Sequence, residues 1–194
     1  MNFIFIILTF LISAVIARIL IPRILLISLR KKLFDIPDDR KIHKRAIPRL
    51  GGVSFFPTTL FAFCLVYAFR LLDGDSISTL YASYLLPELL LFACGMTLLY
   101  LTGIADDLVG VRYRQKFAIQ IFCACLFPLS GLWINDLYGL FGIHELSAYV
   151  GIPFTVLTVV FITNAINLID GIDGLASGLS SVALLVFTFL FISK

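Results

Sequence analysis

The sequence predicts an all-α, polytopic membrane protein with about six transmembrane helices. Of its 194 residues, 60% are apolar and only 14% are charged, whereas a soluble domain has roughly 45–50% apolar and about 25% charged residues. The mean hydropathy is +1.05, and a chain of this composition folded in water would expose large apolar patches. These values exclude a soluble enzyme, a disordered tail and a disulfide-stapled secreted module. We therefore expect the chain to lie in a membrane and to have no nucleic acid as a partner.

Six apolar stretches define the expected helices of a single membrane domain, residues 1–194. A helix needs about 20 residues to cross the hydrocarbon core, and most of the stretches are that long. Their Val, Ile and Phe content would favour strands in water, but a backbone in lipid must satisfy its hydrogen bonds internally, which favours helices. The expected spans are Phe3–Ile21, Val53–Leu72, Leu85–Ile104, Phe117–Ile134, Val150–Thr163 and Leu175–Ile192. The fifth is short, so we expect it to include apolar residues that follow it.

The end of the first stretch combines basic residues with a proline. Arg18, Pro22 and Arg23 indicate where the first helix reaches the lipid headgroups and bends. Residues 22–33 are then expected to continue along the membrane surface, with the basic residues near position 31 facing lipid phosphates.

Basic residues are distributed unevenly among the connections between the stretches. Eight of the fifteen Lys and Arg residues lie in 30–52 and three more lie in 105–116, whereas 73–84 and 135–149 contain none. Cytoplasmic loops carry an excess of Lys and Arg. We therefore expect the two basic connections in the cytoplasm and the N-terminus outside. From the number of spans alone, the connection at 164–174 is also expected in the cytoplasm.

The first of these connections combines positive charge with residues that interrupt helices. Pro37 and Pro48 break helical structure, and Gly51-Gly52 allows backbone N–H groups to approach a ligand just before a helix begins. This pattern favours an anionic ligand, phosphate above all. The alternative is a solvated loop whose charge only fixes the topology. The basic side chains are those of Arg40, Lys41, His43, Lys44, Arg45 and Arg49.

The second connection begins with two adjacent acids, Asp106 and Asp107, at the end of the third expected helix. The negative pole of the helix dipole destabilises them by some tenths of a kcal/mol, and the two carboxylates repel each other. A divalent cation or a proton would relieve both effects. Alternatively, one of the acids caps the next helix.

The third connection has polar residues at helical spacing. Asn164 and Asn167 are three residues apart and therefore share one helix face, and Asp170 and Asp173 are each followed by glycine. Such polar groups are costly in an apolar setting unless they are buried in protein or bind something. Their carbonyl and carboxylate oxygens are donors that Mg²⁺ accepts. The alternative is a polar seam between two helices.

The three connections together favour phosphoryl-transfer chemistry. They place basic groups and hard oxygen donors on the same membrane face. A metal ion and cations neutralise a diphosphate during in-line displacement in such reactions.

These residues also resemble a known family, the polyprenyl-phosphate N-acetylhexosamine-1-phosphate transferases of glycosyltransferase family 4. Asp106-Asp107 is similar to the family's first acidic pair, with Lys116 and Gln120 in the positions that follow it. The most specific stretch runs from Asn164 to Ala176 as Asn-x-x-Asn-x-x-Asp-Gly-x-Asp-Gly-Leu-Ala. The first connection resembles the N-acetylglucosamine branch through Asp35, Pro37, Arg40, Lys41, His43, Pro48, Arg49, Gly51 and Gly52.

The resemblance implies that UDP-GlcNAc and undecaprenyl phosphate react to undecaprenyl-diphospho-GlcNAc and UMP, with Mg²⁺ or Mn²⁺, in the bacterial cytoplasmic membrane. This would be the first membrane step of a cell-envelope polysaccharide such as lipopolysaccharide O-antigen or teichoic acid. The sequence is also compatible with a homo-oligomer. The implied catalytic residues are Asp106, Asp107, Asp170 and Asp173; the substrate-binding residues are Arg40, His43, Arg49, Lys116, Asn164 and Asp173; and the metal ligands are Asn167 and Asp170.

Two further motifs of the family do not occur in the 194 residues: a Phe-x-Gly-Asp-x-Gly-Ser sequence and a later histidine cluster. His144 does not replace the cluster, because it lies in a connection expected outside. We therefore expect the chain to correspond to the N-terminal part of the family's fold. One alternative is a catalytically silent fragment or assembly piece. Another is a transporter, which helices broken by Gly and Pro would favour.

Overall fold

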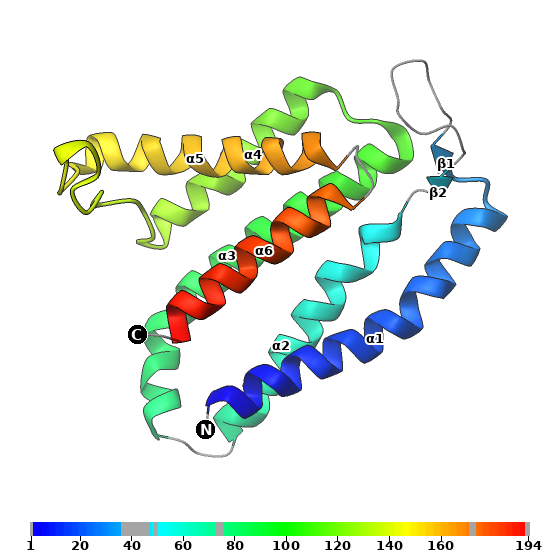
Figure 1. Ribbon diagram of the computed structural model, residues 1–194, viewed down its shortest axis with the longest axis horizontal. Coiled ribbons are helices and arrows are strands. Elements are labelled where there is room, and N and C mark those ends of the chain that lie inside the picture. The colour runs from blue at the N-terminus through cyan, green and yellow to red at the C-terminus, as the bar shows by residue number, and fades with distance from the viewer. Residues whose placement is uncertain (1, 36–46, 49, 73–75, 171–173, 193–194) are drawn as a thin grey trace.

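The computed structural model is helical apart from two short strands, and it describes residues 2–35, 47–48, 50–72, 76–170 and 174–192. Six α-helices occupy the six expected apolar stretches (Figure 1). They are α1 (Asn2–Arg30), α2 (Phe55–Leu72), α3 (Ser76–Val109), α4 (Tyr113–Leu129), α5 (Ala148–Ile169) and α6 (Leu175–Ile192). Two 3-10 turns, η1 (Gly51–Ser54) and η2 (Leu140–Gly142), and the antiparallel strands β1 (Phe34–Asp35) and β2 (Ile47–Pro48) complete the described elements. The prediction of an all-α fold is confirmed.

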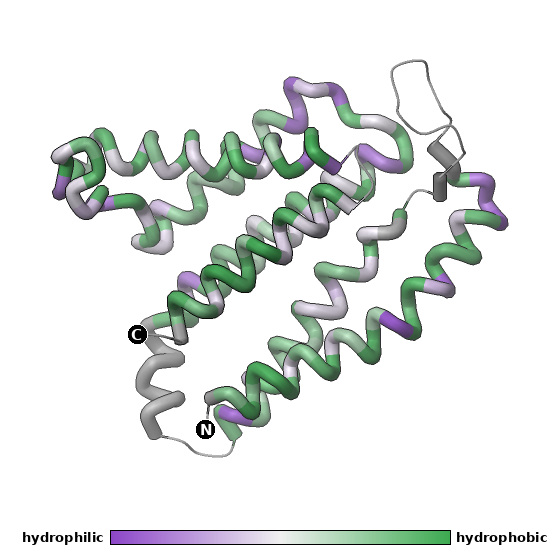
Figure 2. Tube along the Cα trace, in the orientation of Figure 1, coloured by the Kyte–Doolittle hydropathy of each residue, from purple (hydrophilic) through white to green (hydrophobic). Residues whose placement is uncertain are grey.

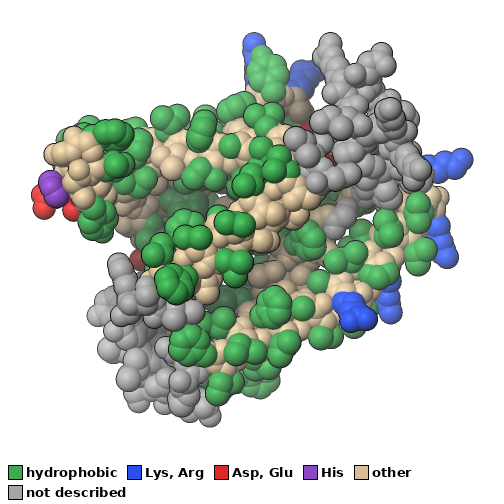
Figure 3. All heavy atoms as spheres, in the orientation of Figure 1, with side chains coloured by type: hydrophobic (Ala, Val, Ile, Leu, Met, Phe, Trp, Pro, Cys, Tyr) green, Lys and Arg blue, Asp and Glu red, His purple; other side chains and the backbone are tan. Residues whose placement is uncertain are grey.

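Four segments of the described chain are long and apolar enough to span a membrane: Phe3–Arg30, Gly52–Leu72, Leu85–Val109 and Ala148–Ile169. Apolar residues run along the helices, and the strongly polar residues gather mainly in the connections (Figure 2). Large apolar side chains cover the outside of the helices, with Lys and Arg concentrated toward one end (Figure 3). Such a surface suits lipid rather than water. Six helices with four such spans therefore support a multi-pass membrane protein, while its orientation remains a prediction.

Two helices are longer than the sequence predicts. α1 continues through Pro22 to Arg30 instead of ending in a separate surface segment. α3 starts at Ser76, within a stretch expected to be a connection, and contains Pro87. Proline cannot donate an intrahelical hydrogen bond and crowds the preceding turn, which accounts for the change of direction in the first part of α3 (Figure 1). In both cases the helix continues through the proline, because a backbone in lipid must satisfy its hydrogen bonds internally.

α4 ends earlier than predicted because a glycine reverses the chain. Gly131 has a φ of +90°, a conformation that glycine adopts without steric cost. Its N–H donates to Pro128, and the N–H of Leu132 donates to Phe127. These two bonds form a Schellman motif that satisfies the last carbonyls of the helix. Ile134, expected inside the fourth span, therefore lies in the connection to α5.

The helices pack in antiparallel pairs: α1 along α2, α3 along α4, and α4 along α5 (Figure 1). The apolar side chains buried on α4 and α5 are small or medium-sized, namely Cys123, Ala124 and Val160. Small side chains allow membrane helices to approach closely. As a result, the end of α3, the start of α4 and the end of α5 lie together at one end of the fold.

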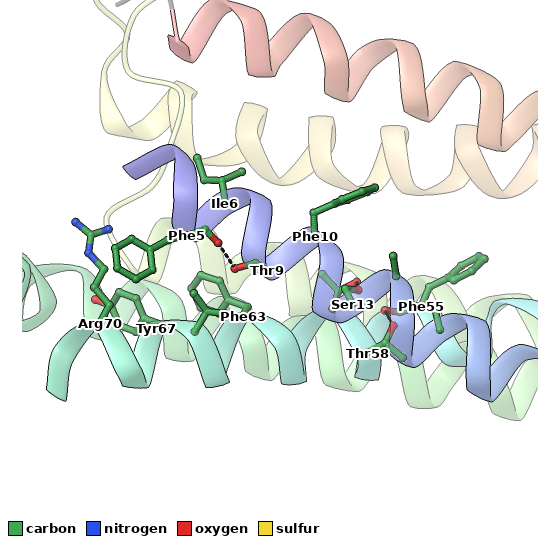
Figure 4. Close-up of a pocket in the computed structure, with 14 residues that line it drawn as sticks. Phe5, Ile6, Thr9, Phe10, Ser13, Phe55, Thr58, Phe63, Tyr67 and Arg70 are labelled. Atoms are coloured by element: carbon green, nitrogen blue, oxygen red, sulfur yellow. Dashed lines mark hydrogen bonds between the residues drawn. The ribbon is translucent and has the colours of Figure 1, made fainter. Parts of the chain in front are cut away.

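A groove of about 700 Å³ runs between α1 and α2. Figure 4 shows Phe5 and Phe10 of α1 and Phe63 of α2 along its walls. The guanidinium of Arg70 lies 5.4 Å from the ring centroid of Phe5, in the last turn of α2 and away from η1. The groove is mostly apolar, so it suits hydrocarbon better than a phosphate group.

Replacing Gly151 with alanine is expected to destabilise the protein. A Cβ atom on Gly151 would lie 2.5 Å from both the carbonyl oxygen of Ile134 and the ring of Trp133. Relieving this overlap should cost about 1–3 kcal/mol. The unfolding midpoint in detergent should therefore fall by several degrees. Gly178→Ala is the control, since its Cβ would meet no atom within 4 Å, and an unchanged midpoint for Gly151→Ala would contradict this packing.

Candidate functional site

The ends of three helices are joined by one lysine. The ammonium group of Lys116, in the first turn of α4, lies 3.0 Å from Oδ2 of Asp106 at the end of α3. The same group donates to Oδ1 of Asn167, near the end of α5, at 3.1 Å. The side chains of Lys116 and Asp106 are 23% and 31% exposed, so the ion pair is partly shielded and partly open to solvent. The structure therefore brings together three of the residues predicted to form the site.

Asp106 is held in place by the turn that ends α3. Gly110 has a φ of +73°, and its N–H donates to the carbonyl of Asp106 at 3.0 Å. The next residue, Val111, donates its N–H to Oδ1 of Asp106 at 2.9 Å. The carboxylate thus uses one oxygen for the backbone and the other for Lys116. These contacts offset the unfavourable position of an acid at a helix C-terminus.

The alternative interpretation, in which one acid of the pair caps α4, is wrong. Arg112 occupies the N-cap position of that helix and makes no capping bond through its side chain. Asp106 instead closes the turn before it. Asp107 is exposed at the same helix end, and it provides a second carboxylate beside the ion pair.

A second polar contact joins α4 and α5 one helical turn away. The side-chain amide of Asn164 donates to Oε1 of Gln120 at 2.7 Å and to the carbonyl of Val160 at 2.8 Å. Gln120 is 5% exposed. Asn164 and Asn167 therefore face α4 together, as their spacing predicts. The contact of Asn164 is that of a polar seam between helices, and its predicted role in substrate binding is not tested by the fold.

Asp170 lies at the C-terminal cap of α5, exposed and one turn beyond Asn167. Its carboxylate forms no hydrogen bond or ion pair with the other described residues. Asp173 lies outside the described residues. Gly174, with a φ of +77°, leads into α6. The sequence pattern thus leaves Asp170 at the end of the fold where Lys116 and Asp106 meet.

The basic connection is fixed at its two ends. β1 pairs with β2, with Phe34 opposite Pro48 and Asp35 opposite Ile47. Beyond β2, the hydroxyl of Tyr100 on α3 donates to the carbonyl of Val53 at 2.9 Å. These contacts attach the connection to the half of α3 that leads to Asp106. Arg40, His43 and Arg49 lie outside the described residues.

The described residues do not by themselves form a metal site. They contain no group of three or more His, Cys, Asp or Glu side chains close enough to hold an ion. Oδ1 of Asn167 accepts a hydrogen bond from Lys116. Oxygen donors of the kind that Mg²⁺ accepts are present, but this set is incomplete. The assignment of Asn167 and Asp170 as metal ligands therefore remains a prediction.

Gln120 is the residue that the predicted site set lacked. In the resemblance to the family, Gln120 appears only as one of the positions that follow the acidic pair. Its spacing of four residues from Lys116 places both on one face of α4, and this was the available signal. Nothing in the sequence indicated that it would bond to Asn164.

One known protein family matches this part of the chain. The sequence profile of Glycosyl transferase family 4 matches residues 89–194, more than half of the chain. The chain belongs to glycosyl transferase family 4. The matched range contains Asp106, Lys116, Asn167 and Asp170, and it begins after the basic connection. Family 4 membership therefore covers the part of the candidate site in which the structure shows contacts.

Relatives of this family 4 chain extend the similarity to its N-terminal half. A probable undecaprenyl-phosphate N-acetylglucosaminyl 1-phosphate transferase of Bacillus subtilis is 31% identical, over 92% of the chain and 46% of the relative. The phospho-N-acetylmuramoyl-pentapeptide-transferase of Staphylococcus carnosus is 29% identical, over 96% and 59%. An undecaprenyl-phosphate alpha-N-acetylglucosaminyl 1-phosphate transferase of Thermotoga maritima is 30% identical, over 87% and 47%. The chain spans about half the length of these relatives, and no solved structure matches it significantly.

Proposed function

We propose that the protein transfers GlcNAc-1-phosphate, or a related N-acetylhexosamine-1-phosphate, from a UDP-sugar to undecaprenyl phosphate and releases UMP. In the net reaction, a phosphate oxygen of the lipid bonds to the β-phosphorus of the UDP-sugar. The bond between that phosphorus and the oxygen of UMP breaks, and UMP leaves with the electron pair. The family's sugar-1-phosphate transferases support this reaction class.

The contact of Lys116 with both Asp106 and Asn167 is the observation that carries the proposal. It puts a cation, a carboxylate and an amide oxygen at one partly open point where three helices end. A diphosphate substrate needs positive charge at such a point, because negative charge must be held while UMP leaves. Lys116 can supply that charge if its ammonium group exchanges its protein partners for a phosphate oxygen.

The remaining residues are assigned roles within this proposal. Asp106 and Asp107 position or deprotonate the lipid phosphate. Asn167 and Asp170 would lie by the metal ion and the diphosphate, Asn164 would contact substrate, and Asp173 would lie by the uridine. The basic residues of the first connection, Arg40, His43 and Arg49, hold phosphate groups or the nucleotide.

A divalent cation, Mg²⁺ or Mn²⁺, is part of the proposal because it would neutralise diphosphate charge during transfer. Treatment with EDTA is expected to stop UMP release, and added Mg²⁺ is expected to restore it. Activity that persists in EDTA would contradict the metal requirement.

The proposed location is the bacterial cytoplasmic membrane, with the Lys116 end of the fold facing the cytoplasm. UDP-sugars are soluble and charged, so they must reach the site from water rather than from lipid. The positive connections at this end support the orientation. The product would begin an envelope polysaccharide.

The test measures UMP released from a panel of UDP-sugars by membranes containing this chain, with and without undecaprenyl phosphate. The full-length Bacillus subtilis relative serves as the positive control. We expect UMP release that requires the lipid phosphate and is highest with UDP-GlcNAc. An active control beside an inactive chain would overturn the proposal and favour a catalytically silent fragment.

A further inference from the structure

Two polar contacts connect α4 and α5, and they differ in the flexibility and burial of their side chains. Lys116 reaches Asn167 through a flexible four-carbon side chain. Gln120 and Asn164 meet through shorter side chains, at 2.7 Å, and Gln120 is almost fully buried. A buried amide that loses its partner is costly, so this second contact constrains the two helices more strongly than the first.

We propose that Gln120 is a positioning residue, which acts through Asn164 to hold Asn167 against Lys116. The inference rests on the proposed function, because its consequence is the orientation of a substrate-binding cation. Among the described residues, Gln120 hydrogen-bonds neither to the Lys116–Asp106 pair nor to Asn167. Its effect is transmitted along α5, from Asn164 to the residue three positions further on.

The geometry of the two helices supports this coupling. Lys116 and Gln120 are four residues apart on α4, and Asn164 and Asn167 are three apart on α5, so each pair lies on one face. The helices run antiparallel, and the contacts therefore follow one another along the same interface. Beyond them, Ala124 and Val160 are buried, which allows the backbones to approach. A rotation of α5 that removed Asn164 from Gln120 would also remove Asn167 from Lys116.

The amide of Asn164 leaves little freedom for such a rotation. Its nitrogen donates to Gln120 and to the carbonyl of Val160 one turn earlier, so both of its hydrogens have acceptors. The bond to Val160 fixes the side chain on α5, and the bond to Gln120 fixes α5 on α4. Removing Gln120 breaks only the bond between the helices.

The test measures the rate at which an amine-reactive reagent modifies Lys116. Mass spectrometry of the purified protein in detergent follows the modification. The exposed Lys31 and Lys32 serve as internal references. We expect Gln120→Leu to raise the rate at Lys116 by about ten-fold, the lower end of what one hydrogen bond to a charged group is worth. The double variant Gln120→Asn with Asn164→Gln conserves the total length of the two side chains, and it should restore most of the protection.

Cys123→Ala is the matched control, because it changes a buried residue of the same helix without removing a polar contact between α4 and α5. Its Lys116 rate should remain within about two-fold of the wild type. If Gln120→Leu leaves the Lys116 rate unchanged, or if Cys123→Ala raises it equally, the positioning role is overturned.

Activity gives a second measurement that is separate from the first. For Gln120→Leu we expect kcat to fall by about 10²-fold at most, the cost of a small misplacement in a reacting complex, with KM for the UDP-sugar nearly unchanged. A transferase whose kcat is unaffected would contradict the positioning role. Failure of the proposed function would be recognised differently, by absence of UMP release from the wild type while the labelling pattern holds.

Discussion

Asp106→Asn is expected to lower the rate of UMP release by about 10²–10⁴-fold, the range for loss of an acid–base or charge-positioning group. The substitution keeps an oxygen that can accept the N–H of Val111, now 2.9 Å from Oδ1. It removes the negative charge that pairs with Lys116 at 3.0 Å. The end of α3 should therefore remain folded while the charge is lost.

The control for this variant is Asp136→Asn. Asp136 also accepts a backbone N–H through Oδ1, from Tyr138 at 2.6 Å, but it lies in the connection between α4 and α5 away from Lys116. Its activity should match the wild type, and both variants should retain a wild-type elution profile in detergent. Activity of Asp106→Asn within a few-fold of the wild type would show that this carboxylate does not take part in the reaction.

Lys116→Met is expected to lower the same rate by about 10²–10³-fold, the loss seen when a charge-stabilising group is removed from a site. Methionine keeps an unbranched side chain of similar reach, but it has no group that can donate to Asp106 or Asn167. It also removes the cation proposed to hold the diphosphate. Lys116→Arg should recover only part of the activity, because a planar guanidinium does not reproduce the donor geometry of an ammonium.

Arg114→Met is the control for charge alone. Arg114 is exposed on the same helix and contacts the neighbouring Tyr113 through a hydrogen bond and a cation–π contact. The total charge changes equally in the two variants, so a merely electrostatic attraction of substrate would affect them alike. Equal losses for Arg114→Met and Lys116→Met would contradict a specific role for Lys116.

The meeting of Asp106, Lys116 and Asn167 could be predicted from the sequence. Basic residues in the connections indicate which helix ends share a membrane face, and the polar residues of the three motifs lie at those ends. Helices that follow one another in the chain usually lie side by side, and the packing of α4 against both α3 and α5 brings these ends together. Their mutual distances follow from the packing and were not predictable from the pattern.

Other features required the fold. An amide side chain has donors and an acceptor, so the sequence could not indicate whether Asn164 would bind substrate or bond to Gln120. Pro22 suggested a bend where the first helix reaches the lipid headgroups, but α1 continues through it to Arg30, because a backbone in lipid keeps its hydrogen bonds within the helix. Gly131 ended α4 earlier than the apolar stretch suggested, because a local turn outweighed hydrophobicity.

The central claim is that the Lys116 end of the fold belongs to a site that transfers a sugar together with its phosphate. It is tested by UDP-GlcNAc labelled in both the sugar and the β-phosphorus, incubated with undecaprenyl phosphate and membranes containing this chain. We predict that both labels enter the lipid fraction in equal amounts and that UMP appears in the aqueous phase. Lys116→Met should slow the transfer and the release of UMP by about 10²–10³-fold. Transfer of the sugar label alone, or no transfer by a folded chain under conditions in which the Bacillus subtilis relative is active, would contradict the claim.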